Sequence, residues 1–195
     1  MKEPVPTLEG LRRALAIHQP RPSGRGGKRL AAVAAIVRPR GDGAELLFIH
    51  RSEHERDPWS GHMAFPGGRV DPKDSDAQAA ARRETREEIG LDLASEARLL
   101  GQLSDVAAIG RGRPLRMVIV PFVFELAGEP PLVPNHEVQE TVWVPLHFLA
   151  NRRNRETMQW RYHGVPLPLP CLQFEGHLIW GLTLRMADEL LNLAR

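Results

Sequence analysis

The chain has 195 residues, 42% of them hydrophobic and 26% charged, so it is long enough to bury a core and has a globular composition. Lys and Arg (26) exceed Asp and Glu (24) by only two, so the pI of about 9.1 does not predict a nucleic-acid partner. The single cysteine, Cys171, excludes an internal disulfide and is compatible with a reducing cytoplasm. No apolar run reaches about 18 residues and the N-terminus lacks a signal-peptide apolar region, so we expect a cytoplasmic protein without a membrane span.

Residues 1–28 are predicted to form an N-terminal helix and a flexible linker, ahead of one domain over residues 29–195. Leu8, Leu11 and Leu15 recur at helical spacing between residues 8 and 17. Residues 21–28, RPSGRGGK, have the composition of a flexible basic linker. No internal repeat and no further domain boundary is visible in the sequence.

Beyond the linker, the pattern predicts a mixed sheet flanked by helices. A helix is expected from Asp76, as its N-cap, to Gly90, a glycine suited to a helix end. The other predicted elements are strands at residues 30–37, 45–50, 97–103, 117–126 and 138–144, loops at 39–43, 57–62 and 111–114, an irregular segment at 128–135, a short helix at 145–151, a hairpin at 162–172 and a closing helix at 178–193.

Three glutamates on the predicted helix over residues 76–90 form the most informative cluster. Glu84, Glu87 and Glu88 stand at i, i+3 and i+4, so they share one helix face within about one turn. Like charges this close repel, and oxygen ligands without a neighbouring His or Cys favour Mg²⁺ or Mn²⁺ over zinc. The alternative interpretation is a solvated acidic face. The FPGG turn at residues 65–68 favours the metal site, because it brings bare backbone close to the carboxylates.

This stretch resembles the Nudix box of the Nudix hydrolases. Its residues read Gly68-x5-Asp74-x8-Arg83-Glu84-x2-Glu87-Glu88-x-Gly90-Leu91, and the usual box reads G-x5-E-x7-R-E-U-x-E-E-x-G-U, with U a bulky aliphatic residue. Asp74 replaces Glu, Thr85 replaces the aliphatic residue, and one extra residue precedes Arg83. The resemblance implies the Nudix α/β/α sandwich and metal-dependent hydrolysis of a nucleoside diphosphate linked to another group.

The resemblance also implies roles within the box. Glu84 and Glu88 are expected as direct ligands of Mg²⁺ or Mn²⁺, joined by the backbone carbonyl of Gly68. Glu87 is expected either as a third ligand or as the group that activates water. Arg83 is expected to fix a glutamate rather than to touch the substrate.

The general base and the substrate contacts are less closely defined. The base stays open between a box glutamate and a loop acid, for which Glu137 is the candidate and Glu140 lies nearby. The alternative is that Glu137 only caps a strand or faces water. Arg56, His62 and Gly67 are the substrate-binding candidates. Gly67 belongs to the glycine turn and His62 lies near it, although a solvated or structural histidine is the more ordinary case. Arg56 stands one position before the place where the resemblance described next implies a basic residue.

Three features resemble the coenzyme A diphosphatase branch of the family: the extra residue in the box, Gly61-x3-Phe65-Pro66-Gly67-Gly68, and Ile179-Trp180-Gly181-Leu182-Thr183. They imply cleavage of coenzyme A or acyl-coenzyme A to 3′,5′-ADP and (acyl-)4′-phosphopantetheine. Asp57 stands where that branch has a basic residue, and residues 57–60 look like an insertion. The alternatives are a Nudix pyrophosphatase for another nucleotide (ADP-ribose, NADH, a nucleotide sugar or a nucleoside triphosphate) and a non-catalytic Nudix ligand-binding module. A small-molecule nucleotide diphosphate is the expected partner, and the sequence leaves a homodimer open.

Overall fold

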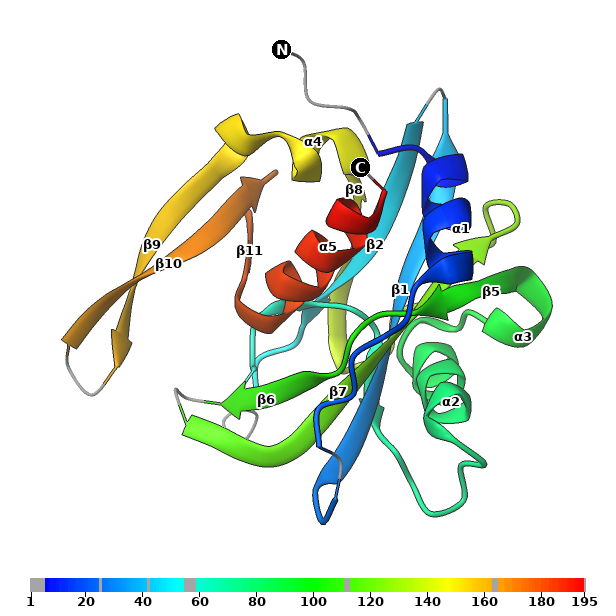
Figure 1. Cartoon of the computed structure of the whole chain (residues 1–195), viewed down its shortest axis with the longest axis horizontal. Helices are drawn as coiled ribbons and strands as arrows, with labels where there is room; N and C mark the ends of the chain where they lie inside the picture. Colours follow the sequence, from blue (N-terminus) through cyan, green and yellow to red (C-terminus); the bar gives the residue numbers. More distant parts are fainter. Residues whose placement is uncertain are drawn as a thin grey trace.

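The computed structural model describes residues 6–24, 26–41, 43–54, 59–110, 113–162 and 165–194. In these ranges the chain forms a large sheet with helices on both faces and a smaller three-stranded sheet beside it (Figure 1). The helices are α1 (Leu8–Ile17), α2 (Ala77–Ile89), α3 (Leu93–Glu96), α4 (Leu146–Ala150), the 3-10 helix η1 (Arg152–Asn154) and α5 (Gly181–Leu193). The strands are β1 (Arg29–Arg40), β2 (Gly43–Arg51), β3 (Met63–Ala64), β4 (Gly67–Arg69), β5 (Ala97–Gln102), β6 (Val106–Gly110), β7 (Arg113–Leu126), β8 (Val138–Pro145), β9 (Arg155–Tyr162), β10 (Val165–Phe174) and β11 (His177–Trp180).

The large sheet is mixed. Its central path runs β3-β2-β1-β7-β5, while β4 pairs with β1, β6 with β7 and β8 with β2. β1 and β7 are parallel, and the other described pairings are antiparallel. A strand buried on both faces is expected to be almost continuously apolar, as β1 is over residues 30–37. The smaller sheet has the order β11-β10-β9.

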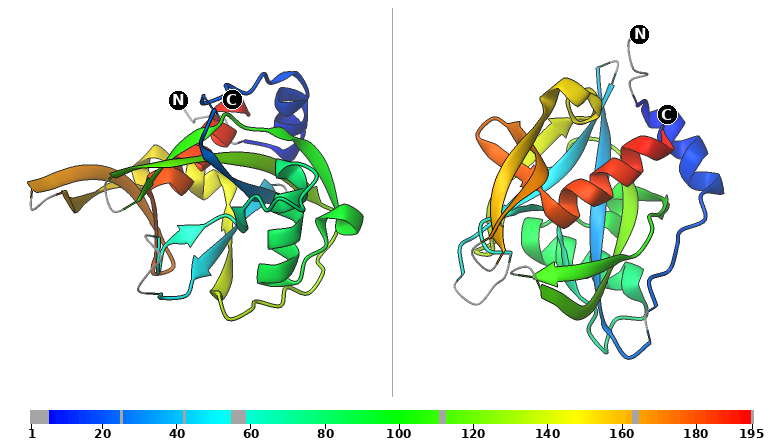
Figure 2. Two further views of the ribbon diagram at one scale, coloured as in Figure 1. Left: turned by 90° about the horizontal axis from the view of Figure 1, so that it is seen from below. Right: turned by 60° about the vertical axis from the view of Figure 1, so that its left-hand side comes forward.

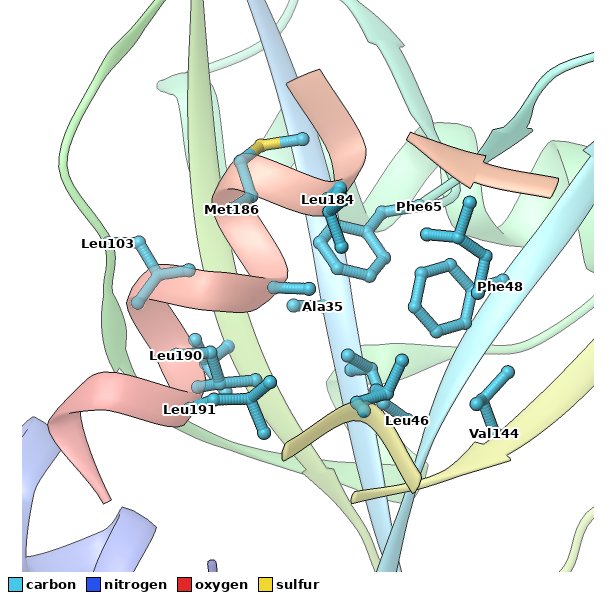
Figure 3. Close-up of a cluster of buried hydrophobic side chains, with 14 of the residues drawn as sticks. Ala35, Leu46, Phe48, Phe65, Leu103, Val144, Leu184, Met186, Leu190 and Leu191 are labelled. Atoms are coloured by element: carbon cyan, nitrogen blue, oxygen red, sulfur yellow. The ribbon is translucent and has the colours of Figure 1, made fainter. Parts of the chain in front are cut away.

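Alternate residues of β1 enter two separate hydrophobic cores. Ala35 and Val37 belong to the core that includes residues of α1 and α5, called the α5-side core below. Ala34 and Ile36 belong to the core that includes residues of α2, called the α2-side core. Figure 2 shows α1 and α5 on one face of the sheet and α2 on the other. In the first core, side chains of α5 meet the central strands (Figure 3): Leu184, Met186, Leu190 and Leu191 lie beside Ala35, Leu46 and Phe48.

Most of the predicted elements are confirmed. The helix at residues 8–17 and the helix between Asp76 and Gly90 are present, and the five predicted strands correspond to β1, β2, β5, β7 and β8. The hairpin predicted at 162–172 is present as β9 and β10, but its first strand lies earlier, at 155–162. The predicted loop at 39–43 is wrong at residues 39, 40 and 43, which belong to β1 and β2. The closing helix was placed too early, because residues 178–180 belong to β11 and α5 starts at Gly181. The predicted loop at 111–114 is also wrong at Arg113 and Pro114, which belong to β7 and pair with β6; residues 111–112 lie outside the described residues.

Helix α1 packs on the large sheet. Leu11 and Leu15 of α1 are buried in the α5-side core. Further along, the backbone N–H of Arg21 donates to Ser104 Oγ at 3.1 Å. The division into residues 1–28 and a domain over 29–195 stays a prediction. No helix in the described part of the chain combines the length and the apolar character needed to cross a membrane. The cytoplasmic location stays a prediction.

Candidate active site

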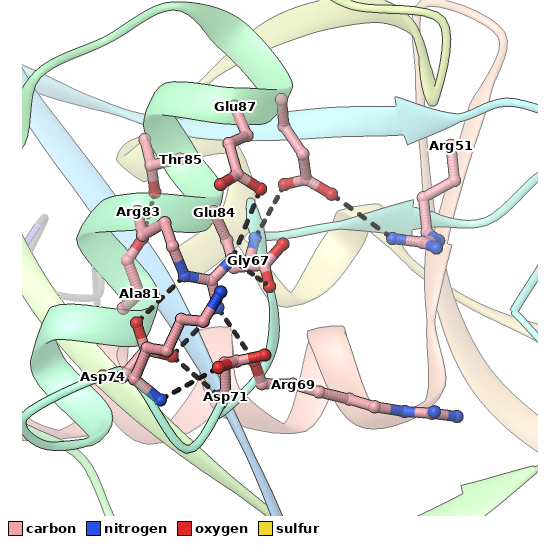
Figure 4. Close-up of polar contacts among 12 residues, drawn as sticks. Arg51, Gly67, Arg69, Asp71, Asp74, Ala81, Arg83, Glu84, Thr85 and Glu87 are labelled. Carbon is pink, nitrogen blue, oxygen red and sulfur yellow. Dashed lines mark hydrogen bonds and ion pairs between the residues drawn. The ribbon is translucent and has the colours of Figure 1, made fainter.

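Helix α2 presents the clustered glutamates in a fixed register. The Asp76 side chain caps its start by accepting a first-turn backbone hydrogen bond at 2.7 Å. Gly90 ends it in the left-handed region, with φ 72°, which glycine adopts without strain. Between these caps, Glu84 and Glu87 project toward the turn at Gly67 (Figure 4).

Arg83 connects the loop before α2 to two of the glutamates (Figure 4). Its Nε and Nη2 donate to the two carboxylate oxygens of Asp74, each at 2.9 Å. Its Nη1 donates to Glu84 at 2.9 Å and to Glu87 at 3.3 Å, and the carbonyl of Arg69 accepts from Nη2 at 3.1 Å. The bonds from Arg83 hold the pKa of Asp74 below its usual range, so this carboxylate stays charged. Arg83 is therefore fixed on both sides and restricts where Glu84 can lie.

Glu88 is the buried carboxylate of the cluster, with only 3% of its side chain exposed. The N–H of Gly67 donates to its Oε2 at 2.8 Å, and Nη1 of Arg51 lies 3.6 Å from its Oε1. Burial raises the pKa of Glu88 to about 7, because the Gly67 hydrogen bond and the Arg51 charge offset only part of the lost hydration. The negative charges of Glu84 and Glu137 raise it further. An ionised Glu88 is thus incompletely compensated by the protein itself.

Two consecutive glycines allow this arrangement. An added Cβ at Gly68 would lie 2.4 Å from Cδ of Glu84, so any other residue would displace that carboxylate from its present position. At Gly67, where φ is 148°, an added Cβ would lie 2.2 Å from the carbonyl oxygen of Ala32. Gly67 therefore lets β4 pair with β1, whereas Gly68 admits Glu84 against the strand. Burial raises the pKa of Glu84 as well, while Arg83 lowers it.

Glu137 approaches the same carboxylates from the residue before β8. Its N–H donates to Asn135 Oδ1 at 2.8 Å, and its carbonyl accepts from the N–H of Ser52 at 2.8 Å. Its side chain is 52% exposed, and its charge raises the pKa of both Glu84 and Glu88. The fold thus brings Glu137 near two of the α2 glutamates. Its role as general base stays a prediction.

Comparison with known families decides the assignment. A NUDIX domain model matches residues 28–162, more than half of the chain. The chain belongs to the Nudix family. Over 155 residues it is 35% identical to the human mitochondrial coenzyme A diphosphatase NUDT8, a match that covers 76% of this chain and 62% of that protein. The chain therefore spans less than two thirds of the human protein's length.

Solved structures of Nudix proteins show the same architecture. A MutT/nudix family protein from Enterococcus faecalis superposes with a TM-score of 0.56 at 19% identity, over 95% of this chain and 66% of that one. A C. elegans Ap4A hydrolase binary complex superposes with a TM-score of 0.51 at 24% identity, over 60% of this chain and 80% of that one. These likenesses confirm the predicted Nudix α/β/α fold, with its mixed sheet and flanking helices.

Two departures from the usual Nudix box have a local explanation. Asp74 lies in a tight turn, where its N–H donates to the carbonyl of Asp71 at 2.9 Å and its Oδ2 accepts from the N–H of Asp71 at 2.7 Å. This turn brings the shorter acid within reach of Arg83. Thr85 is fully buried, and its hydroxyl donates to the carbonyl of Ala81 at 2.7 Å, so burial leaves no polar atom unsatisfied there. Both residues are therefore accommodated by hydrogen bonds within this chain.

The donor set fits the cation that Nudix hydrolases generally use. The predicted ligands Glu84, Glu87, Glu88 and the Gly68 carbonyl would supply only oxygen atoms, the ligand type that Mg²⁺ and Mn²⁺ prefer. The buried charge of Glu88 is undercompensated, which a bound cation would correct. The identity of the metal and the ligand roles of Glu84, Glu87, Glu88 and the Gly68 carbonyl stay predictions.

The predicted substrate-binding residues lie in different places. Gly67 is in the site, with its N–H on Glu88. Arg56 lies outside the described residues. The ring centroids of His62 and Trp180 lie 4.9 Å apart. His62 also lines a cavity of about 360 Å³, and none of the box glutamates is among the described residues that line it. A substrate-binding role for His62 stays a prediction.

Sequence reasoning missed Arg51, the cation beside Glu88. It lies at the end of β2, outside the box, and no motif marks it. The alternation of β2 contains the signal: Leu47 and Ile49 face the α2-side core, and a strand repeats every two residues. Arg51 is next in that series, so its side chain emerges on the α2 face.

Proposed function

We propose that this protein is a cation-dependent Nudix pyrophosphohydrolase that cleaves coenzyme A or acyl-coenzyme A to 3′,5′-ADP and (acyl-)4′-phosphopantetheine. The observation that carries the hydrolase part is the carboxylate group around the Gly67–Gly68 turn, in which Arg83 binds Glu84 and the Gly67 N–H binds Glu88. The coenzyme A part is supported by the 35% identity to the human mitochondrial coenzyme A diphosphatase NUDT8.

In this proposal Glu84 and Glu88, with Glu87 and the Gly68 carbonyl, hold Mg²⁺ or Mn²⁺. When bound, the cation neutralises phosphate oxygens and lowers the pKa of a coordinated water. The protein's contribution is positioning. Arg83 holds Glu84 through a 2.9 Å bond, and its two bonds to Asp74 keep the guanidinium from turning toward the diphosphate. Positioning of this kind lowers the barrier, because the reacting groups need no further ordering.

Glu137 is the proposed acceptor of the water proton. Its half-exposed carboxylate is not engaged by Arg83 in the described contacts, and its described ion-pair partner is the exposed His136, 3.9 Å away. Glu87 is about as exposed, but it accepts from Arg83 at 3.3 Å, and Arg83 is itself held by Asp74. A base must release and regain a proton in each turnover, so a carboxylate outside the Arg83 network suits the role better than one bonded to this fixed guanidinium.

A substrate panel tests the proposal. Purified protein is incubated with Mg²⁺ or Mn²⁺ and with coenzyme A, acyl-coenzyme A, ADP-ribose, NADH, nucleotide sugars or nucleoside triphosphates, and the products are identified by mass spectrometry. The expected result is release of 3′,5′-ADP from a coenzyme A substrate at the highest kcat/KM, with Glu88→Gln as the inactive control. Cleavage of another nucleotide with coenzyme A untouched would reject the substrate class but keep the Nudix chemistry. Ligand binding without turnover of any substrate would favour the non-catalytic module.

A further inference from the structure

We propose a second metal site, for Zn²⁺, formed by His50, Glu140 and His177. Oε1 of Glu140 lies 3.4 Å from Nδ1 of His50 and 3.8 Å from Nε2 of His177. One ligand atom from each residue lies within 4.8 Å of the other two. A tetrahedral zinc ion with bonds of about 2.0–2.2 Å separates its ligand atoms by roughly 3.3–3.6 Å. The three side chains therefore need only small adjustments to share one ion.

The three side chains come from three different strands and meet at one point. His50 of β2 and Glu140 of β8 are register partners in the large sheet. His50 follows Phe48 by two residues and Glu140 precedes Val142 by two, and both apolar residues lie in the α5-side core. His177 of β11 likewise precedes a buried residue of that core by two positions. The cluster is thus where the two sheets meet, at the polar end of their shared apolar interface.

This cluster is separate from the Nudix carboxylates. His50 faces the α5-side core, whereas the next residue, Arg51, reaches Glu88 on the α2 face. The two sites therefore lie on opposite faces of the same end of β2. A metal at the His–Glu–His cluster would join β11 of the smaller sheet to β2 and β8 of the large one.

The ligand types select the metal. Two imidazoles and one carboxylate suit Zn²⁺ and related transition ions, whereas Mg²⁺ prefers oxygen ligands alone. His50 and His177 are partly buried and Glu140 is half exposed, so the site is ordered but accessible. It opens on the cavity of about 360 Å³, whose lining includes both histidines, Met158 and Trp180. Three protein ligands beside a cavity leave a fourth position for water or a small ligand.

The competing interpretation is a metal-free cluster in which the Glu140 carboxylate simply bridges the two histidines. Zn²⁺ titration distinguishes the two. The full chain is stripped of metal and dialysed, excess Mg²⁺ is added to occupy the Nudix carboxylates, and Zn²⁺ binding is measured by calorimetry. Visible absorption of bound Co²⁺ serves as a second probe, because it reports a low coordination number with nitrogen ligands.

The expected result is one tightly bound Zn²⁺ in the wild type. His50→Ala and His177→Ala should each weaken binding by at least about tenfold, because even the loss of an outer hydrogen-bond partner has an effect of that size. Glu88→Gln should keep the Zn²⁺ affinity, and so should His147→Ala, which removes an exposed imidazole from α4.

Absence of Zn²⁺ binding in the presence of Mg²⁺, or binding that both histidine variants retain, would overturn the proposal. Glu140→Gln guards against a folding artefact, because this side chain is half exposed and its replacement keeps the shape. If the histidine variants unfold, the Zn²⁺ affinity and the Co²⁺ spectrum of Glu140→Gln decide the question: an unchanged affinity and spectrum would reject the site.

Discussion

Among single residues, Glu88 carries the sharpest prediction. Glu88→Gln removes the buried charge, while the amide oxygen can still accept the hydrogen bond from Gly67. We expect kcat/KM to fall at least about 10²-fold, equivalent to about 2.7 kcal/mol of barrier, with no loss of stability in metal-free protein, because burial disfavours the ionised carboxyl. Steady-state kinetics and urea unfolding measure the two effects.

Glu129→Gln is the matched control for that variant. Glu129 forms an exposed ion pair with Arg40 at the end of β1, whereas Gly67 and Gly68 pair with residues near the start of that strand. It should leave kcat/KM unchanged. Near-normal turnover in Glu88→Gln and in Glu87→Gln together would reject the assignment of the box glutamates as the metal site.

The two glycines of the turn should respond differently to alanine. Gly68→Ala places a methyl group on the Glu84 carboxylate, whose flexible end can move away. We expect at least a tenfold loss of kcat, because small displacements of catalytic groups are costly to rate. The free energy of unfolding should change by about 1 kcal/mol or less, because the carboxylate can move aside and little strain remains. Gly67→Ala meets rigid backbone at Ala32 and should unfold or aggregate. Gly26→Ala, at a glycine with open space around it, is the control for both.

Glu137→Gln separates a base from a ligand. If Glu137 accepts the water proton, kcat should fall by about 10²-fold or more, while the Kd for Mn²⁺ stays the same. Titration of Mn²⁺ by electron paramagnetic resonance provides the second readout. A parallel loss of Mn²⁺ affinity would reassign Glu137 as a metal ligand, and unchanged kcat would leave it as a strand-end residue.

The residues that sequence reasoning found are those whose partners are close in sequence. Glu84, Glu87 and Glu88 lie within one helical turn, and Arg83 is next to them, so spacing alone brought them together. Arg51 and the His50–Glu140–His177 cluster depend on strand pairing across the whole chain. Strand pairing cannot be read from the local sequence, which shows only the alternation of apolar and polar residues within each strand.

At the level of elements, the predictions are correct where the signal is local in sequence and wrong where it depends on strand pairing. α2 was predicted because Asp76 is a typical N-cap residue and Gly90 a typical residue at a helix end. β11 was taken for the start of α5 because its apolar residues continue the helical spacing of the segment that follows. The boundary depends on Gly181, which turns the chain with φ 64°, and on the pairing of β11 with β10, which periodicity does not contain. The β6–β7 hairpin was missed for the same reason.

The attachment of α1 to the sheet gives a pH-dependent prediction. Glu125 of β7 accepts hydrogen bonds from Arg12 of α1 and Arg98 of β5, and these bonds hold its pKa below the ordinary value of 4.5. The stabilisation is therefore present above that value and is lost as the pH falls through the lowered pKa. We expect Glu125→Gln to lower the unfolding midpoint at neutral pH and to lose less stability than the wild type on acidification.

Urea unfolding followed between about pH 6 and pH 3 measures this difference. Glu9→Gln removes the exposed ion pairs of Glu9 with Arg12 and Arg13 but leaves Glu125 in place, so it is the control and should follow the wild type. Parallel curves for the wild type and Glu125→Gln would show that the contacts of Glu125 add nothing to the acid sensitivity.

For the molecule as a whole, the sheet divides the chemistry between its faces. The α2 face of the sheet holds the Nudix carboxylates. The α5 face holds the larger hydrophobic core, α1 and the junction with the smaller sheet. The sequence pattern predicted a mixed sheet flanked by helices, and the resemblance to Nudix hydrolases implied the α/β/α layering; which helix covers which face was not predicted. The junction between the sheets was not predicted, because β9, β10 and β11 carry no signal for what they pack against.

Because the box carboxylates repel one another in the folded state, cation binding should stabilise the whole domain. A ligand that binds only folded protein raises the free energy of unfolding by about 2.7 kcal/mol at a hundred times its Kd. We expect Mg²⁺ or Mn²⁺ to raise the thermal midpoint and a chelator to lower it. Without metal, the double variant Glu84→Gln with Glu88→Gln should have a similar or higher thermal midpoint, because the repulsion between the two carboxylates is removed. Its midpoint should not respond to Mg²⁺, because two of the predicted ligands are removed as well. A Mg²⁺ response that this variant retains would mean that the stabilising cation binds elsewhere on the chain.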